Sequence, residues 1–256
     1  MKVPVIIWTL SQSSIDITKL INEQRESVSS IRIKAFRASN DMISCLRFQE
    51  GHLDVLRSFG FKVSSTTEDW MMSDDTFVIL VESMDSSRVY GGARLEFCNR
   101  GRKVPIQTAL MDLAPEINDF ISGQVNYSTA ELCGLWNSVS VAGMGIGSVY
   151  SIRAALAVAG LLKVHNILAL CSVHSYRMAS VFGFALLKEV GEEGIVYYEG
   201  AKQNAHITFH EDFIKMRNVS IEERDKIMSL INQPIQVVIE ERNGTNLNIA
   251  YDLQII

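Results

Sequence analysis

The pattern of apolar and polar positions along this chain predicts alternating strands and helices. Two β-rich runs, Thr76 to Glu82 and Val89 to Phe97, flank the polar turn Asp85 to Ser87, so we expect a hairpin. A second hairpin is expected near the C-terminus, because Asn243-Gly244 is a typical two-residue hairpin turn. The other predicted strands are 130–141, 167–172, 195–199 and 205–209, and the C-terminal hairpin pairs 236–241 with 246–252.

Apolar residues at helical spacing predict the helices. The segment 15–61 is interpreted mostly as helix, ending near Gly60. The other predicted helices are 105–121, 148–162, 175–182 and 221–230. The helix 148–162 is apolar nearly all round, which indicates that it is buried. The run 167–172 is wholly apolar, which is typical of a strand in a sheet covered on both faces.

A glycine-rich loop, Ala142 to Ser148, joins a predicted strand directly to the buried helix. Its three alternating glycines allow the backbone to turn its N–H groups inward, and the helix adds the positive end of its dipole. This arrangement suits a pyrophosphate, although a glycine-rich turn without chemical consequence is the alternative. The predicted cofactor-binding residues are Val139, Val141, Ala142, Gly143, Met144, Gly145, Ile146, Gly147, Ser148 and Arg177.

Two other nucleotide-binding motifs are disfavoured at this loop. A dinucleotide-binding fold requires G-x-G-x-x-G and an acidic residue at the end of the next strand, but that strand ends at Ser172 and is followed by Val173-His174. A phosphate-loop NTPase requires a lysine before the Ser or Thr, and Gly147 occupies that place.

Composition limits the classes of function. The formal net charge is -5 over 256 residues, without the clustered Lys and Arg that nucleic acids require. The four cysteines are widely spaced and form no metal-binding pattern, so no metal is expected. The apolar stretch 149–170 contains charged and polar residues and is not expected to span a membrane. The short apolar run Val3 to Leu10 is interpreted as a strand or a disordered lead, with a signal peptide as the alternative. A cytoplasmic location is expected.

The segment from Val139 to Phe184 resembles the GNAT acyltransferases. In that family a splayed central strand precedes a loop of pattern [Q/R]-x-x-G-x-[G/A] that holds the pyrophosphate of coenzyme A. Gly145 and Gly147 match its small positions, while Ala142 replaces the Gln or Arg. The Gly183-Phe184 pair also fits, whereas Ala179 stands where a tyrosine general acid is common. The unaligned Tyr176 is a possible substitute for that acid.

A second resemblance extends over residues 32–213. The order Gly91-Gly92-Ala93-Arg94, a helix and then Glu131 is similar to that of autoinducer synthases and N-acyl amino acid synthases, although Gly134 stands where they usually carry arginine. This resemblance implies transfer of a fatty acyl group, of medium or long chain, from acyl-CoA or an acyl-carrier protein to an amine.

Three side chains are candidates for catalysis. Glu131, at the start of the predicted central strand, is the first candidate for the base that deprotonates the amine, with an exposed structural glutamate as the alternative. His174 follows the partner strand and has a pKa range suited to proton transfer, although it is equally well interpreted as a surface residue. Arg94 is a candidate clamp for a carboxylate or phosphate, or else an outward-facing strand residue.

The sequence therefore predicts a single α/β domain, with a mixed, splayed central sheet flanked by helices and a C-terminal hairpin extension. Its core is expected at about 30–213, with 214–256 as an appendage. The predicted function is acyl transfer from acetyl-CoA or a longer acyl-CoA to the amine of a small molecule. Two alternatives stay open: a catalytically degenerate sensor that binds acyl-CoA, and an interaction protein that uses the fold as a scaffold.

Overall fold

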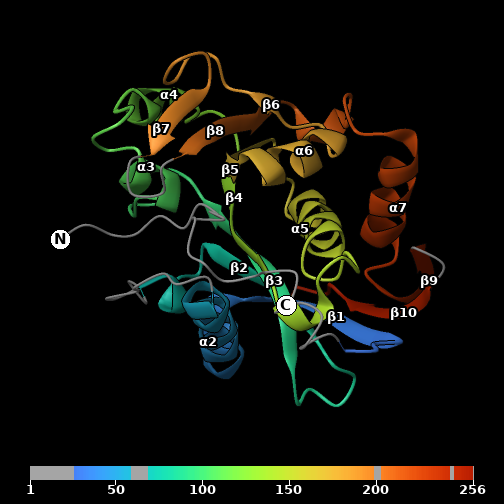
Figure 1. Ribbon diagram of the computed structural model, residues 1–256. Helices are drawn as coiled ribbons and strands as arrows, with labels where there is room; N and C mark the ends of the chain where they lie inside the picture. Colours follow the sequence, from blue (N-terminus) through green and yellow to red (C-terminus); the bar gives the residue numbers. More distant parts are fainter. Residues whose placement is uncertain (1–25, 59–68, 199–202, 243–244, 256) are drawn as a thin grey trace.

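The computed structural model describes residues 26–58, 69–198, 203–242 and 245–255, and its strands form one mixed sheet. The strand order is β6-β8-β5-β4-β3-β2-β1-β10-β9, and β7 also pairs with β8. Figure 1 shows this twisted sheet with helices on both of its faces. The prediction of a mixed α/β sheet flanked by helices, with a C-terminal hairpin, is confirmed.

The strands are β1 (Ser30–Arg37), β2 (Thr76–Glu82), β3 (Val89–Phe97), β4 (Thr129–Asn137), β5 (Asn166–Ser172), β6 (Ala185–Leu186), β7 (Ile195–Tyr198), β8 (Gln203–His210), β9 (Ile235–Arg242) and β10 (Thr245–Asp252). The helices are α2 (Met42–Ser58), α3 (Pro105–Ala109), α4 (Ile117–Gly123), α5 (Val149–Leu161), α6 (Val173–Val181) and α7 (Ile221–Asn232). Short 3-10 turns include η3 (Val139–Val141) and η5 (Phe213–Lys215).

The core consists of layers on the two faces of the sheet. Strand β2 is buried along its whole length. Its side chains point alternately to the two faces of the sheet, and a layer of core residues covers each face. Phe77, Ile79 and Val81 belong to the layer beneath α5, while Val78 and Leu80 belong to the layer beneath α2. A third cluster lies under α3 and α4 and reaches the strands β5 and β8.

The central strand–helix–strand unit is the predicted one. Strand β4 leads through the glycine-rich loop to α5, and β5 then returns parallel to β4. Ten consecutive residues of α5, from Tyr150 to Ala159, are buried. The sheet covers one side of α5 and α7 covers another. Side chains on most of the helix surface are therefore buried, which explains why the sequence of α5 is apolar nearly all round.

The N-terminal helix prediction was too long. Residues 30–37 form the strand β1, because Ile31, Ile33 and Ala35 alternate inward with period 2. In the described part of 15–61 the α-helix is confined to Met42–Ser58, preceded by a short 3-10 turn at Ala38–Asn40. The run Val3 to Leu10 lies outside the described residues.

Two other element boundaries were also wrong. The predicted helix 105–121 is interrupted between α3 and α4, where Pro115 supplies no N–H and disfavours helical geometry in the residue before it. The predicted strand 130–141 stops at Asn137. Ser138 accepts a hydrogen bond from the amide of Ser140 and starts the turn η3, so a local side-chain bond replaces strand pairing.

The C-terminal hairpin is part of the main sheet. Strand β10 pairs in parallel with β1, from Ser30 opposite Asn248 to Lys34 opposite Asp252. Both strands of the hairpin are observed, whereas the predicted Asn243-Gly244 turn lies outside the described residues. The last strands of the chain therefore extend the edge formed by its first described strand.

Candidate functional site

The two parallel strands β4 and β5 separate part-way along their length. They pair only from Thr129 to Glu131, opposite Asn166 to Leu168. Beyond that point β4 contains an irregularity opposite β3, where Gly134 has a φ of 57°. Glycine adopts this left-handed conformation at little cost, so the bulge can bend β4 away from β5.

A small cavity of about 60 Å³ lies where the strands separate. Its walls come from both strands and from the start of the neighbouring helices: Leu132, Cys133, Gly134, Leu135, Ile152, Ala169, Leu170, Cys171, Ser175, Ala179 and Phe184. The lining is mostly apolar. An extended, narrow group can therefore enter between two strand backbones at this place.

The glycine-rich loop follows directly from the separated end of β4. Gly143 and Gly145 have φ of 81° and 79°, a conformation that other residues adopt only with strain. Among the described residues, the amides of Gly143, Gly145 and Ile146 have no hydrogen-bond partner. The helix α5 begins without a side-chain cap. Unpaired amides at the positive end of a helix are suited to an anion.

Gly147 serves a different purpose from the other two glycines. A Cβ there would lie 2.6 Å from the Cα of Asn137 and from the carbonyl oxygen of Trp136, so only glycine fits. Its amide donates a hydrogen bond to Oδ1 of Asn137 at 2.7 Å. Gly147 thus fixes the loop against β4, and its N–H is not available to a ligand.

A buried cluster of charged groups lies across β3 and β4. Glu96 is fully buried, and its carboxylate pairs with Arg94 at 3.2 Å and Arg102 at 2.5 Å. The Cys133 thiol donates to Oε1 of Glu96 at 3.4 Å. Glu131 stands opposite Glu96 in the strand register. Two of the three predicted catalytic residues, Glu131 and Arg94, therefore share one cluster.

Glu131 is not the exposed residue that the alternative interpretation described. Its exposed fraction is 2%, and its Oε2 accepts a hydrogen bond from the amide of Ile106, in the first turn of α3, at 2.8 Å. Burial raises the pKa of the Glu131 carboxyl to about 8, with a further upward effect from Glu96, although the Ile106 amide opposes it.

Arg94 belongs to β3 and lies opposite the bulge of β4. Its guanidinium stacks over the ring of Trp70 at 4.3 Å from the centroid, and a Cβ on Gly134 would lie 3.2 Å from its Nε. Nε is buried and has no hydrogen-bond partner within the described residues. A buried N–H donor without an acceptor is costly, which makes this atom a candidate for contact with a ligand oxygen, although Arg94 itself does not line the cavity.

The other predicted residues lie apart from this cluster. His174 and Arg177 are both exposed on α6, which begins where β5 ends, and no contact joins either of them to Glu131. Burial, followed by the neighbouring Glu96, raises the pKa of the Cys133 thiol, which disfavours a thiolate nucleophile.

Sequence reasoning missed Glu96, Arg102 and Asn137. Arg94 and Glu96 are two apart in a predicted strand and therefore share a face, which was the signal for a polar cluster. Asn137 ends the strand before the glycine-rich loop, where a short amide side chain often organises a turn. Arg102 gave no signal, because it reaches Glu96 from a loop.

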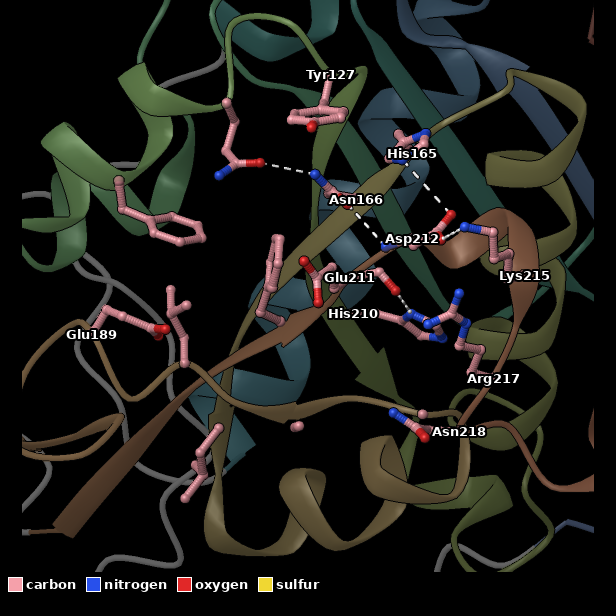
Figure 2. Close-up of a pocket in the computed structure, with 17 residues that line it drawn as sticks. Tyr127, His165, Asn166, Glu189, His210, Glu211, Asp212, Lys215, Arg217 and Asn218 are labelled. Carbon is pink, nitrogen blue, oxygen red and sulfur yellow. Dashed lines mark hydrogen bonds and ion pairs between the residues drawn. The ribbon is translucent and has the colours of Figure 1, made fainter.

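A larger hollow, about 860 Å³, lies at the opposite end of β5 (Figure 2). Its polar groups are largely paired with one another: Asn166 donates to Gln124, the Asp212 amide donates to Asn166, and Lys215 forms an ion pair with Asp212. No residue predicted for catalysis or cofactor binding lines it. None of the predicted residues lines the cavity between the strands either, but Cys133 and Gly134 of its wall lie beside Arg94. The glycine-rich loop also presents unpaired amides at the start of a helix, so we take the separated strands and this loop as the candidate site.

Solved structures with a similar fold were found. FeeM, an N-acyl amino acid synthase from uncultured soil microbes, superimposes with a TM-score of 0.55 at 10% identity, over 76% of this chain and 98% of that chain. The CoA-dependent acyl-homoserine lactone synthase BjaI gives a TM-score of 0.51 at 12% identity, over 88% and 92%. MesI, another CoA-dependent acyl-homoserine lactone synthase, gives 0.50 at 12%, over 78% and 95%.

No protein-family model matches the sequence, and no curated protein matches it by sequence. The helices in the described part of the chain are too short or too polar to cross a membrane. Residues 26–58, 69–198, 203–242 and 245–255 contain no group of three or more His, Cys, Asp or Glu placed to hold a metal ion. The similarity at 10–12% identity concerns the fold.

Proposed function

We propose that this chain is an acyltransferase acting on a small-molecule amine. The premise is that it has the GNAT-like fold of those synthases. One observation carries the proposal: a loop of unpaired amides leads into the uncapped start of α5, and the same helix contributes Ile152 to the wall of the cavity between β4 and β5. A thioester donor with a pyrophosphate needs both features. Acyl-CoA is the proposed donor, with an acyl-carrier protein as the alternative.

The loop is proposed to hold the pyrophosphate through its backbone. The amides of Gly143, Gly145 and Ile146 and the first turn of α5 supply donors, whereas Ala142 supplies no side-chain contact. Arg177 stays a proposed phosphate contact from α6, where its exposed side chain is free to turn toward a ligand.

The acyl group is proposed to enter the cavity between the strands. Its volume of about 60 Å³ is close to twice the ~30 Å³ that a water molecule occupies in the liquid. That space suits an acetyl group or a slightly longer chain. The synthase resemblance implied medium or long chains, whereas this cavity by itself favours a shorter acyl group than that resemblance implies.

The reaction is proposed to be direct transfer. The deprotonated amine attacks the thioester carbonyl, the C–N bond forms, the C–S bond breaks, and the thiolate leaves with the electron pair. The amine loses its proton to a base, for which Glu131 stays the proposed residue, and the thiolate takes up a proton. Nε–H of Arg94 is proposed to bind a substrate oxygen at the bulge. The amides of Ser140 and Val141 are already bonded, so a polarising amide is expected on the separated part of β4.

A sensor that binds acyl-CoA without turnover is the second candidate. It is favoured by Ala179, which lines the cavity where a tyrosine acid is common, and by Tyr176, whose ring stacks on His206 at a centroid distance of 4.9 Å. Ala179 offers no acid for the leaving thiolate, and Tyr176, the possible substitute, does not line the cavity.

The two candidates separate in one assay. The purified chain is incubated with acetyl-, hexanoyl- or dodecanoyl-CoA and a mixture of amines, and free thiol is measured alongside calorimetric binding. Thiol release that depends on the amine supports the transferase. Binding without release supports the sensor, and the absence of both contradicts the proposed site. Since acyl-CoA is a cytoplasmic metabolite, the proposal also places the protein in the cytoplasm.

A further inference from the structure

The edge strand β9 has one neighbour among the described residues. It is the last strand in the sheet order, and its eight residues pair in unbroken antiparallel register with β10. Figure 1 shows it at the outer margin of the sheet, below α7. One row of its backbone N–H and C=O groups therefore faces away from the sheet, without a strand partner in the described chain.

The exposed side of β9 is apolar. Ile235, Val237 and Ile239 are 54%, 71% and 69% exposed and alternate along the strand. Of the two side chains between them, Gln236 bonds to Ser229 and Val238 packs against the core. Soluble proteins usually protect a sheet edge with charge, proline or a bulge. In β9 the charged residues are confined to the last three positions, 240–242, and Pro234 precedes the strand, so the five residues Ile235–Ile239 between them carry no such protection.

The order of these residues fits a second copy of the same chain. Ile-x-Val-x-Ile reads identically in both directions, so an antiparallel copy centred on Val237 places Ile235 opposite Ile239 and Val237 opposite itself. The same register sets Glu240 against Pro234 and Glu241 against Gln233, so no two carboxylates oppose each other. A two-fold interface requires such self-complementarity, whereas an unrelated partner strand does not.

We propose that two copies of this chain form a dimer by antiparallel pairing of their β9 edges about Val237, which continues the sheet across the two-fold axis. The pairing satisfies the outward backbone groups and brings six exposed aliphatic side chains into cross-strand contact. This dimer does not depend on the proposed activity. Strand β9 is at one end of the strand order, whereas β5, which lines the cavity, lies toward the other end.

The oligomeric state tests the surface. Light scattering on a sizing column is expected to give twice the chain mass for the wild type and half that value for Val237→Lys. A cooperative melting transition shows that the variant is folded, at a Tm lowered only by the loss of dimerisation. Val125→Lys is the matched control, because Val125 has the same 71% exposure in a loop elsewhere, and it is expected to stay dimeric. A monomeric wild type, or a Val237→Lys variant that stays dimeric, overturns the proposal.

Cysteine cross-linking tests the register. In the proposed dimer residue 237 lies opposite its own copy, with Cβ atoms about 4.5–5.5 Å apart, close enough for a disulfide after a small adjustment. Val237→Cys is therefore expected to cross-link with itself under mild oxidation. Ile235→Cys alone is expected not to cross-link, but to do so when mixed with Ile239→Cys. The wild type controls for native thiols, and equal cross-linking of Ile235→Cys alone contradicts the register.

Discussion

The glycines of the candidate phosphate loop differ in what they contribute. Gly143 and Gly145 supply left-handed backbone, and Gly147 supplies space against β4. Gly145 is buried, so only part of this loop faces the surface. A charge introduced at Gly145 would disturb packing as well as ligand binding. Gly143 is exposed, and a Cβ added there would meet no atom within 4 Å, so it is the better place for a test.

Replacing Gly143 tests the pyrophosphate site. Gly143→Glu adds a carboxylate beside the unpaired amides, and Gly143→Ala adds only the same backbone strain, about 1–2 kcal/mol. The glutamate variant is expected to bind CoA roughly a hundredfold more weakly than the alanine variant, by repulsion of the phosphates and loss of their hydrogen bonds. Calorimetric titration measures the difference. Equal affinity of the two variants would remove the loop from the cofactor site.

Glu131 allows a prediction about pH. If it is the base, kcat/KM rises with pH and levels off above about pH 8, where its carboxyl is ionised. Glu131→Gln keeps an acceptor for the Ile106 amide but cannot take up a proton, so turnover is expected to fall by roughly 10²-fold while acyl-CoA affinity stays the same. A fully active Glu131→Gln variant would leave Glu131 with a purely structural role.

The same residue affects stability independently of catalysis. The folded pKa of about 8 exceeds the ordinary 4.5, so the folded state binds the extra proton between these values. Its contribution is complete below about pH 4.5 and is lost as the pH rises through 8. Urea titrations at several pH values are expected to show this loss in the wild type and not in Glu131→Gln.

At the scale of elements, α5 is held in place by one buried ionic contact. Arg153, with an exposed fraction of 2%, donates two hydrogen bonds to Glu223 of α7 and one to Glu240 of β9. The sequence predicted a buried helix 148–162, and that is confirmed. It gave no indication of the partners of Arg153, which lie 70 and 87 residues further along the chain.

Removing the Arg153 side chain is expected to destabilise the protein strongly. Arg153→Ala leaves the largely buried Glu223 carboxylate without its cation and Glu240 with Lys226 alone, and breaking a buried pair in this way typically costs about 3–5 kcal/mol. Lys188→Ala is the control, because its ion pair with Glu193 is exposed and should contribute little. Chemical denaturation measures both variants. A loss in Arg153→Ala no larger than that of the control would show that the contact does not hold α5.

At the scale of the whole molecule, local patterns predicted the centre of the sheet better than its ends. The unit from β4 to β5 was predictable because a glycine-rich loop, a buried helix and an apolar strand follow one another directly. Strand β1 was missed, since its alternation is short and lies beside a true helix. Its pairing with β10 was not predictable, because no local pattern specifies a partner some 220 residues away. The Glu96 cluster likewise depends on strand register.

Deleting residues 235–256 tests whether the hairpin is an optional extension. Leu247, Ile249 and Leu253 are at most 3% exposed, and burying three such side chains contributes roughly 5–9 kcal/mol. That amount is comparable with the whole stability of a typical domain, roughly 5–15 kcal/mol. The shortened chain is expected to be insoluble or to lack a cooperative melting transition. A soluble, cooperatively folded product would show that 214–256 contains a true appendage.

The parallel pairing of β10 with β1 also determines when folding can finish. Ser29 and Asn248, which are hydrogen-bonded, are 219 residues apart. At synthesis rates of about 5–20 residues per second, roughly 10–45 s pass between the emergence of these two residues from the ribosome. During that interval β1 can pair with β2, but its other edge stays bare. The nascent chain therefore carries an exposed strand edge until β10 has been synthesised, and it is in this period that aggregation or binding by a chaperone is most to be expected.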